Sequence, residues 1–502
     1  MSVCEEKVES EANFKRQLRH CLETLKNASS DNEKFAGLLV FTHLIKTNAD
    51  VNVDENELMQ SIDMHFLVRL LNSTNVPQGC PEFVYKSLAL NILSSFSQYN
   101  VLSHSALLSN LGRILDVFTK NQADNHQMLK DAISIILIFS RNVEGSKNLL
   151  KSKCIPIICK RIMESPETEN LFEIIKGVLL HCPQLSWDEN QTEFLEYLTF
   201  LSTEFSMNQN LLKFESCKKI LVLLSSLDAI QEETAARYVD SFSFKSKTEI
   251  RDGISDILKS RCKVKFKYIA VQLARVMVEL FGLEWTIPYV NESLLVNLTD
   301  AKFLLVVLAI TSTEIHIIFE NNQLNSEPDF VISCYIIIEK MIEFLISDNK
   351  QSWSFSDEVI RSIHSMLTSV FDYLIQFLIG LDSQNPEDNT PQTPILMATI
   401  RVLCMWLSEE TSTLGERIAE VLPILIKWAK YDQVYSSKDN LQETEKLSNE
   451  ILLYLLPPLC HFSAEENFSV ILINEDCPLL LGKLFINLWQ KNNWKKKNIQ
   501  TT

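Results

Sequence analysis

The most informative segment of the chain is Met128-Leu-Lys-Asp-Ala-Ile-Ser-Ile-Ile-Leu-Ile-Phe139. It has the length of a helix, and six of its last seven residues are large and apolar, which leaves almost no polar face. Such a helix has to be covered by neighbours on all sides. The segment therefore predicts a core helix inside a larger helical assembly.

Other apolar helical segments surround it at similar spacing. A helix is predicted from the apolar positions that begin at Phe35, with Asp31 as its N-cap, and another from Phe83 to Phe96. Together with segments at 172–180 and 220–224, the centres lie about 41 to 50 residues apart, near the ~40–47-residue period of armadillo and HEAT repeats. We predict an all-α, armadillo/HEAT-like helical solenoid, with stacked helices in a right-handed superhelix.

After residue 250 the apolar segments come closer together and read as individual helices. They lie at 268–281, 303–310, 331–346, 363–378, 395–407, 421–429 and 451–459. Loops are predicted at 141–148, 182–190, 321–329, 382–394 and 431–445, and two prolines are expected to close a helix within Tyr454–Leu459. We divide the chain into a tail with a first helix (1–30), one armadillo-like helical repeat domain (31–490) and a basic C-terminal tail (491–502).

The composition excludes several classes of protein. The chain has 502 residues, of which 46% are hydrophobic and 22% charged, so it must bury a large core. It carries 47 basic and 64 acidic residues, and the resulting charge of −17 disfavours nucleic acid as a partner. Its 10 glycines are too few for the phosphate loops of nucleotide-binding α/β folds or the corners of β-barrels.

The cysteine pattern, the first residues and the length of the apolar runs indicate a cytosolic protein. The 12 cysteines include no CxxC pair and most lie in apolar helical stretches, as expected for reduced core thiols. The first residues show no apolar signal-peptide region, and the longest unbroken apolar run, Phe303–Ile310, is shorter than the ~18 residues of a membrane span. We expect a cytosolic protein.

Patterns of catalytic and metal-binding residues are missing. No pair of the nine histidines has metal-ligand spacing, and the sequence lacks GxxxxGK[ST], GxGxxG, GxSxG and HExxH. Cys154 and Cys159 have apolar neighbours that favour packing over redox chemistry. We therefore predict no enzyme, no metal, no cofactor and no small-molecule substrate.

Two features are candidate sites. Cys4 lies in a polar N-terminal stretch, where it is either an S-acylated residue, with ~0.8 kcal/mol of membrane affinity per buried CH₂, or a plain exposed thiol. A second group, Lys259, Arg261, Lys263, Lys265 and Lys267, places a basic residue at every odd position. It is either a contact for acidic lipids or an acidic partner, or a solvated turn before a helix that begins at Tyr268.

Four blocks carry a family resemblance: Asp31–Val40, Tyr85–Phe96, Val402–Glu410 and Leu455–Glu466. In this order and at these places they resemble neurochondrin. The resemblance implies an armadillo-like cytosolic protein of neurons and other cells that binds cytoplasmic segments of membrane receptors, including G-protein-coupled receptors. It further implies a role in signalling and neurite outgrowth, restraint of calcium/calmodulin-dependent kinase II phosphorylation, association with endosomal membranes and acylation of N-terminal cysteines. Cys4 matches such a cysteine, whereas Val3 stands where a second one is expected.

Together these inferences predict a non-enzymatic intracellular adaptor that binds receptor tails, modulates signalling and promotes neurite outgrowth. We expect it in the cytoplasm, peripherally on endosomal or plasma membranes through reversible association, and in neuronal projections. An importin-like or chaperone-like carrier is the alternative, although the seven tryptophans do not show the ladder of an importin groove. A hidden enzymatic or lipid-metabolic role is a second alternative.

Overall fold

The computed structural model describes residues 2–47, 58, 60–73, 83–96, 105–119, 126–165, 169–288, 295–321, 327–346, 354–384, 394–410, 413–435, 450–486 and 489, with backbone alone at 2–12, 15, 169, 383–384 and 432–435. These residues form two compact units. Unit 1 contains residues 1–204 and 222–243, and unit 2 contains residues 205–221 and 244–502. Helices α12 and α13 contribute residues to both. The predicted single domain over 31–490 stays a prediction, and the predicted tail at 491–502 lies outside the described residues.

The described residues of unit 1 lie mainly in helices. In chain order they are α1 (Ser2–Asn27), α2 (Asp31–Thr47), α4 (Met64–Asn72), α5 (Val84–Ser95), α6 (Ser105–Leu108), α7 (Leu111–Thr119), α8 (His126–Phe139), α9 (Val143–Lys151), α10 (Cys154–Glu164), α11 (Glu169–His181), most of α12 (Pro183–Met207), the end of α13 (Leu211–Ser225), the 3-10 helix η2 (Ser226–Ala229) and α14 (Glu232–Asp240).

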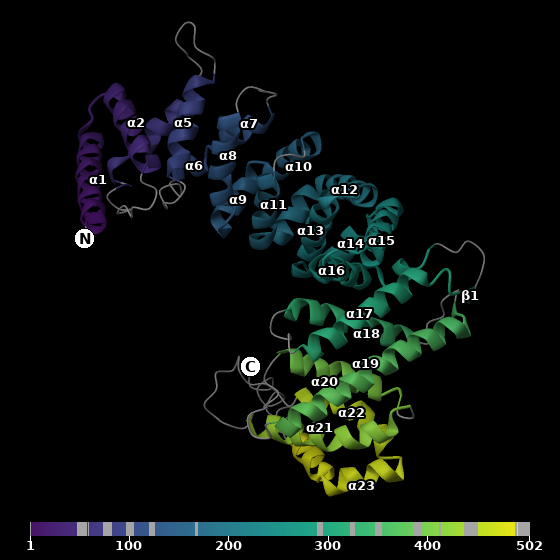
Figure 1. Ribbon diagram of the computed structural model, residues 1–502. Helices are drawn as coiled ribbons and strands as arrows, with labels where there is room; N and C mark the ends of the chain where they lie inside the picture. Colours follow the sequence, from purple (N-terminus) through teal and green to yellow (C-terminus); the bar gives the residue numbers. More distant parts are fainter. Residues whose placement is uncertain are drawn as a thin grey trace, which may run out of the picture. The chain divides into compact units, whose positions relative to one another are not determined.

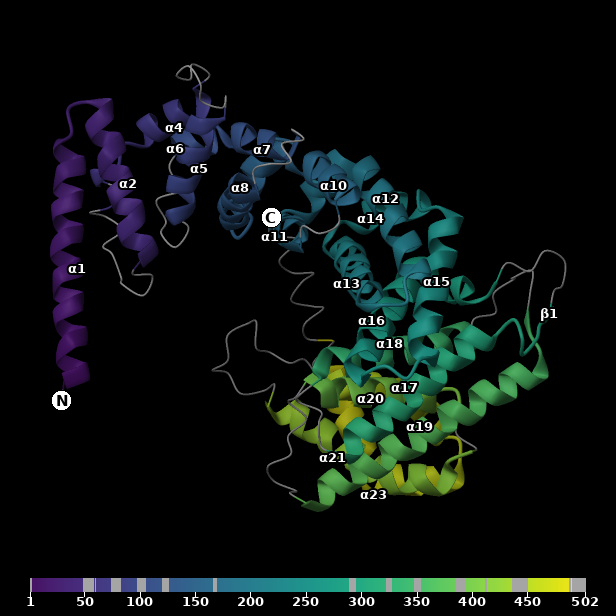
Figure 2. The same cartoon turned by 45° about the horizontal axis from the view of Figure 1, so that its top comes forward.

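The helices of unit 1 stack in rows. Helices α2, α5, α8 and α11 pack one on the next, and α4, α7 and α10 form a second row beside them. The purple and blue helices of Figure 1 follow this order, and α1 lies alongside α2 in both Figure 1 and Figure 2. In α8 the predicted coverage on nearly all sides is confirmed, because Lys130 and Ser134 are the exposed residues of the segment 128–139.

Unit 2 alternates between two rows of helices. Its members after the beginning of α13 are α15 (Phe244–Lys259), α16 (Val264–Phe281), η3 (Leu283–Thr286), α17 (Lys302–Glu320), α18 (Pro328–Ile346), α19 (Asp357–Gln384), α20 (Pro394–Leu407), α21 (Gly415–Tyr435), α22 (Glu450–Phe462) and α23 (Glu466–Asn474). Helices α16, α18, α20 and α22 pack in succession, and so do α15, α17, α19, α21 and α23. The green and yellow part of Figure 1 shows this sequence of helices.

This alternation explains why the sequence period loosens after residue 250. Helices of one row begin at residues 264, 328, 394 and 450, which is 56 to 66 residues apart, while a helix of the other row lies between each pair. All seven apolar segments predicted there fall in α16 to α22, in order. The prediction of an all-α stack of helices is confirmed.

Among the described residues, one small element departs from an all-α fold. Leu295–Val296 (β1) pairs in parallel with Ser354–Phe355 (β2), with Val296 opposite Phe355. Val296 and Phe355 are buried while their strand neighbours are exposed. Two residues per strand are enough to tie the segments before α17 and α19 together.

Within the residues that the structure describes, two helices are long and apolar enough to cross a membrane by length and composition: α17 and residues 357–382 of α19. In unit 2, α17 packs on α15, α18 and α19, and α19 packs on α17, α20 and α21. Their apolar surfaces therefore serve as faces of the helical stack.

Several local predictions are wrong. Residues 141–148 and 182–190 contain helices instead of loops, because Asn142 caps α9 through a 2.7 Å hydrogen bond from the N–H of Gly145 and Pro183 occupies the first position of α12, where its missing N–H costs nothing. Pro457 and Pro458 lie inside α22 and do not end it. The buried contacts of Leu455 and Leu459 on either side outweigh the lost backbone hydrogen bonds.

Candidate binding surfaces

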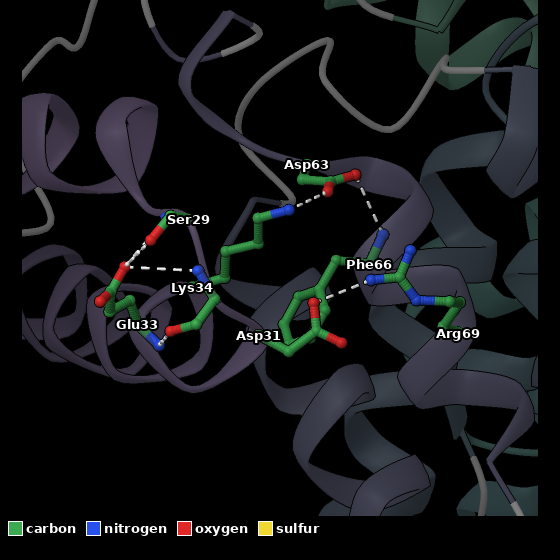
Figure 3. Close-up of polar contacts among 8 residues, drawn as sticks. Ser29, Asp31, Glu33, Lys34, Asp63, Phe66 and Arg69 are labelled. Atoms are coloured by element: carbon green, nitrogen blue, oxygen red, sulfur yellow. Dashed lines mark hydrogen bonds and ion pairs between the residues drawn. The ribbon is translucent and has the colours of Figure 1, made fainter.

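The start of α2, which belongs to the first resemblance block, is fixed by a reciprocal cap (Figure 3). Ser30 Oγ accepts a hydrogen bond from the Glu33 N–H at 3.3 Å, and Glu33 Oε2 accepts from the N–H groups of Ser29 and Ser30 at 2.9 and 3.3 Å. These hydrogen bonds lower the pKa of Glu33. Ser30 is therefore the N-cap, and the prediction that Asp31 fills this role is wrong.

Asp31 and Lys34 instead connect α2 to α4. The Lys34 Nζ atom lies 2.7 Å from Asp63 Oδ2, and Arg69 Nη2 lies 3.0 Å from Asp31 Oδ1 (Figure 3). Burial opposes ionisation of Asp63, but hydrogen bonds from Lys34 and from the Phe66 N–H, together with both nearby cations, hold its pKa below the ordinary value. The charged groups between α2 and α4 thus pair with one another and have a structural role.

A polar chain runs across three helices of one row in unit 1. Lys46 Nζ of α2 donates to Asn91 Oδ1 of α5 at 3.0 Å, and Asn91 Nδ2 donates to Asp131 Oδ2 of α8 at 3.1 Å. Asp131 is 6% exposed and also accepts hydrogen bonds from Ser94 and Gln127. Because a buried carboxylate is costly unless satisfied, these bonds set the register between the stacked helices.

Polar contacts also join neighbouring helices of one row in unit 2. Arg401 of α20 lies 2.7 Å from Glu339 of α18, and the Tyr335 hydroxyl of α18 lies 2.8 Å from Thr399 Oγ1 of α20. Burial raises the pKa of Glu339, and the charge of Arg401 opposes that rise. The two contacts join residues 62 and 64 positions apart in sequence.

Ion pairs in the second row of unit 2 repeat at one spacing. Asp382 of α19 lies 2.7 Å from Lys427 of α21, and Lys430 of α21 lies 3.5 Å from Glu475, which follows α23. Both pairs join residues 45 positions apart. This value falls within the spacing that the apolar segments of the first half predict.

An acidic surface lies on α12 in unit 1. This helix carries Asp188, Glu189, Glu193, Glu196 and Glu204 and has no lysine or arginine. Glu196 lines an open hollow of about 490 Å³ together with Gln191, Thr192, Leu195, Thr199 and Ser241. We refer to α12 residues 188–199 with Asp240 and Ser241 as the acidic surface.

The charge of the acidic surface is held in place by its neighbours. Asp188 accepts hydrogen bonds from the Tyr238 hydroxyl and from Gln184, and these bonds lower its pKa so that it remains ionised. Gln191 Nε2 donates to Ser241 Oγ at 3.1 Å, which connects α12 to the end of α14. This surface was not predicted from the sequence, although the absence of basic residues between 183 and 207 is visible there.

The predicted basic group lies where α15 meets α16, in unit 2. Lys259 ends α15, and Arg261 and Lys263 lie in the connection; these three and Lys265 are exposed. Lys267 is half-buried one turn into α16, where its charge acts on Glu314. Helix α16 begins at Val264, so the expected start at Tyr268 is four residues too late.

Most cysteines are core residues, as predicted. Of the ten that the structure describes, all are free; eight are buried, Cys262 is half-buried and Cys460 is exposed. Burial raises the pKa of Cys154 to about 12 and that of Cys159 further, so neither forms a reactive thiolate. The packing interpretation of this pair is confirmed.

Cys4 lies in the first turns of α1, which begins at Ser2. A polar N-terminal stretch is thus helical at the backbone level. Its acylation stays a prediction.

Tryptophans contribute to the core. Of the five in the described part of the chain, Trp187, Trp285, Trp406 and Trp428 are buried and Trp489 is exposed. Four side chains with 7% exposure or less cannot line a peptide groove in the manner of an importin ladder. Among the described residues no group of three or more His, Cys, Asp or Glu is arranged to hold a metal ion.

The sequence matches one family model over nearly its whole length. The model is described as neurochondrin and covers residues 13–497. The chain belongs to the neurochondrin family. Chicken neurochondrin is 25% identical over 488 residues, and a neurochondrin homolog of Drosophila melanogaster is 24% identical over 496 residues. These alignments cover 94% and 96% of this chain and 66% of each relative, so this neurochondrin-family chain spans about two thirds of the relatives it matches.

Solved structures similar to this neurochondrin-family protein have low identity. An engineered protein matches with a TM-score of 0.48 and 11% identity, over 90% of this chain and 99% of the other. A designed armadillo repeat protein matches with a TM-score of 0.33 and 14% identity, over 52% of this chain and 99% of the other.

Proposed function

We propose that this neurochondrin-family protein is a non-enzymatic adaptor that binds basic segments of partner proteins, above all cytoplasmic tails of membrane receptors. The observation that carries the proposal is the acidic surface, where the four carboxylates that α12 contributes have no basic residue of the same helix among them. A stack of helices offers a binding face without any catalytic group.

Electrostatics gives the proposed interaction its selectivity. Asp188, Glu189, Glu196 and Asp240 are exposed, and the hollow beside Glu196 is open to an extended chain. The net charge of −17 adds long-range attraction for cationic peptides. Such steering raises the association rate and weakens as salt shortens the Debye length.

A peptide titration tests the proposal. A fluorescent lysine- and arginine-rich peptide, designed on a receptor juxtamembrane segment, is mixed with the full chain at low and high salt, and association is followed by stopped flow. We expect the association rate to fall at least about tenfold between the two conditions. A salt-independent rate would reject electrostatic steering.

Charge reversal locates the contact. The variant Glu196→Lys with Asp240→Lys should weaken peptide binding at least about tenfold, whereas Glu164→Lys with Glu409→Lys, which changes the total charge equally at exposed positions elsewhere, should have little effect. Equal loss in both variants would assign the effect to net charge and reject a local site.

The cellular role we propose is regulation of receptor signalling, including calcium/calmodulin-dependent kinase II phosphorylation, and support of neurite outgrowth from a cytoplasmic location on endosomal or plasma membranes. In neurons depleted of the protein, the wild type should restore neurite length. The Glu196→Lys/Asp240→Lys variant should not, while the Glu164→Lys/Glu409→Lys variant should. If both variants restored neurite length, neurite outgrowth would not depend on the acidic surface.

Reversible membrane attachment through Cys4 is a further part of the proposal. Metabolic labelling with a palmitate analogue should mark the wild type and not Cys4→Ser. Equal labelling of the wild type and Cys4→Ser would show that Cys4 is not the acylated residue.

A further inference from the structure

A surface with both basic and apolar side chains lies in unit 2, at the beginning of α13 and the junction of α15 with α16. Its apolar members are Met207, Leu211, Leu212 and Val264, which are 77%, 71%, 53% and 48% exposed. Its basic members are Lys259, Arg261, Lys263 and Lys265, all exposed. We call these eight residues the basic-apolar surface.

Three contacts bring its two segments together. The rings of Phe214 and Phe266 stack with centroids 3.8 Å apart, and Asp256 near the end of α15 accepts hydrogen bonds from Lys213 at 2.9 Å and Gln209 at 3.3 Å. Lys213 is almost fully buried in this pair. The beginning of α13 is thus fastened beside Lys259–Lys265, although about fifty residues separate them in sequence.

The charge of this region is opposite to that of the chain. Residues 205–221 and 256–267 contain eight basic residues and two acidic ones. Both acidic residues are already paired with lysines of the same region, Asp256 with Lys213 and Glu215 with Lys218. Arg261, Lys263 and Lys265 form no ion pair with any residue of the described part of the chain. This excess positive charge therefore has no counter-charge among the described residues.

The basic residues also work against the local fold. Lys263 is the N-cap of α16 and Lys265 lies in its first turn, where no acidic residue occurs. Positive charge at a helix N-terminus interacts unfavourably with the helix dipole. Leucine and methionine side chains that stay exposed contribute no hydrophobic stabilisation to the fold. Local rules are broken mainly at functional or strained sites; the cation–ring contact here, of Lys265 Nζ with Phe266 at 5.5 Å from the centroid, leaves the charge without a counter-ion.

We propose that the basic-apolar surface docks on the surface of an anionic phospholipid bilayer. Lys259, Arg261, Lys263 and Lys265 contact the headgroups, while Met207, Leu211 and Leu212, which stand out from the ends of helices, enter the interface. Lysine or arginine around protruding aliphatic side chains is the combination that interfacial binding requires. This contact is separate from peptide binding at the acidic surface and from acylation of Cys4.

Vesicle co-sedimentation tests the proposal. The full chain, as the Cys4→Ser variant so that acylation contributes nothing, is mixed with vesicles of phosphatidylcholine or of phosphatidylcholine with phosphatidylserine. We expect binding to the second alone, weakened by salt. Arg261→Gln/Lys263→Gln/Lys265→Gln should lower the affinity about 100-fold, since each basic residue contributes about one tenfold step or slightly less.

Matched variants separate the contributions. Lys147→Gln/Lys151→Gln/Lys160→Gln changes the charge equally at exposed positions of unit 1 and should bind as the parent does. Leu211→Ser/Leu212→Ser should lower the affinity while leaving the salt dependence unchanged. Circular dichroism confirms that each variant is folded.

Two outcomes would overturn the proposal. Unchanged vesicle binding by the Arg261/Lys263/Lys265 variant would place any lipid contact elsewhere. Absence of vesicle binding, with a glutamate-rich peptide bound by the parent and lost in that variant, would identify the surface as a docking site for acidic proteins.

Discussion

Removal of Arg401 should leave a buried carboxylate without its counter-charge. Glu339 is 7% exposed, and its partner Arg401 lies 2.7 Å away on the next helix of the row. Breaking a buried pair costs about 3–5 kcal/mol, and because the Arg401 side chain is half-exposed we expect about 2 kcal/mol for Arg401→Met. With a urea slope of about 2 kcal/mol/M, the unfolding midpoint should fall by about 1 M.

A pair on the same helix supplies the control. Lys340 and Glu343 are also 2.7 Å apart, but both side chains are more than 40% exposed. Lys340→Met should therefore change the free energy of unfolding by less than about 1 kcal/mol. The double variant Arg401→Met/Glu339→Gln should recover most of the loss, since the unpaired charge is gone.

The penalty should depend on pH in a defined direction. Burial already raises the pKa of Glu339, and removal of Arg401 raises it further. The pKa of Glu339 is therefore higher in the folded than in the unfolded protein. Protonation of Glu339 stabilises the folded protein fully at pH values below the pKa of the unfolded state, and this stabilisation is lost as the pH rises through the pKa of the folded state. The Arg401→Met penalty should thus be smaller at pH 5 than at pH 7. An equal penalty at both pH values, or one no larger than that of Lys340→Met, would show that Arg401 does not stabilise a buried charge on Glu339.

Three further predictions concern single positions. Ser30→Ala removes the N-cap of α2 and should cost about 1 kcal/mol in urea unfolding; no change would contradict the cap. Gly145→Ala places a Cβ 2.2 Å from the Phe139 carbonyl oxygen and should lower the unfolding free energy by about 1–3 kcal/mol, with a neutral result counting against the packing of α8 on α9. In the native protein a maleimide should label Cys460 and leave Cys154 unlabelled, as read by mass spectrometry; fast labelling of Cys154 would contradict its burial.

The helices were predictable because their signal is local. Apolar positions at helical spacing locate α5, α8, α11 and every helix from α16 to α22. Helix ends were harder. Asp31 and Ser30 are both good N-caps, and the choice of Ser30 depends on Asp31 turning to Arg69 of another helix, which the sequence does not reveal.

The candidate surfaces were predictable only in part. The basic residues 259–265 are visible as a run, but the exposed Leu211 and Leu212 join them through the contact of Phe214 with Phe266, which depends on tertiary packing. Similarly, the carboxylates of α12 are visible in sequence, whereas the hollow beside Glu196 also needs Ser241 from a different segment.

Zero-length carbodiimide cross-linking followed by mass spectrometry tests most directly whether neighbouring repeats contact one another as described. We expect isopeptide bonds between Lys427 and Asp382, between Lys430 and Glu475, and between Lys213 and Asp256, each joining residues 43 to 45 positions apart. Cross-links confined to pairs within one helix, such as Lys340 with Glu343, would contradict the stacked arrangement.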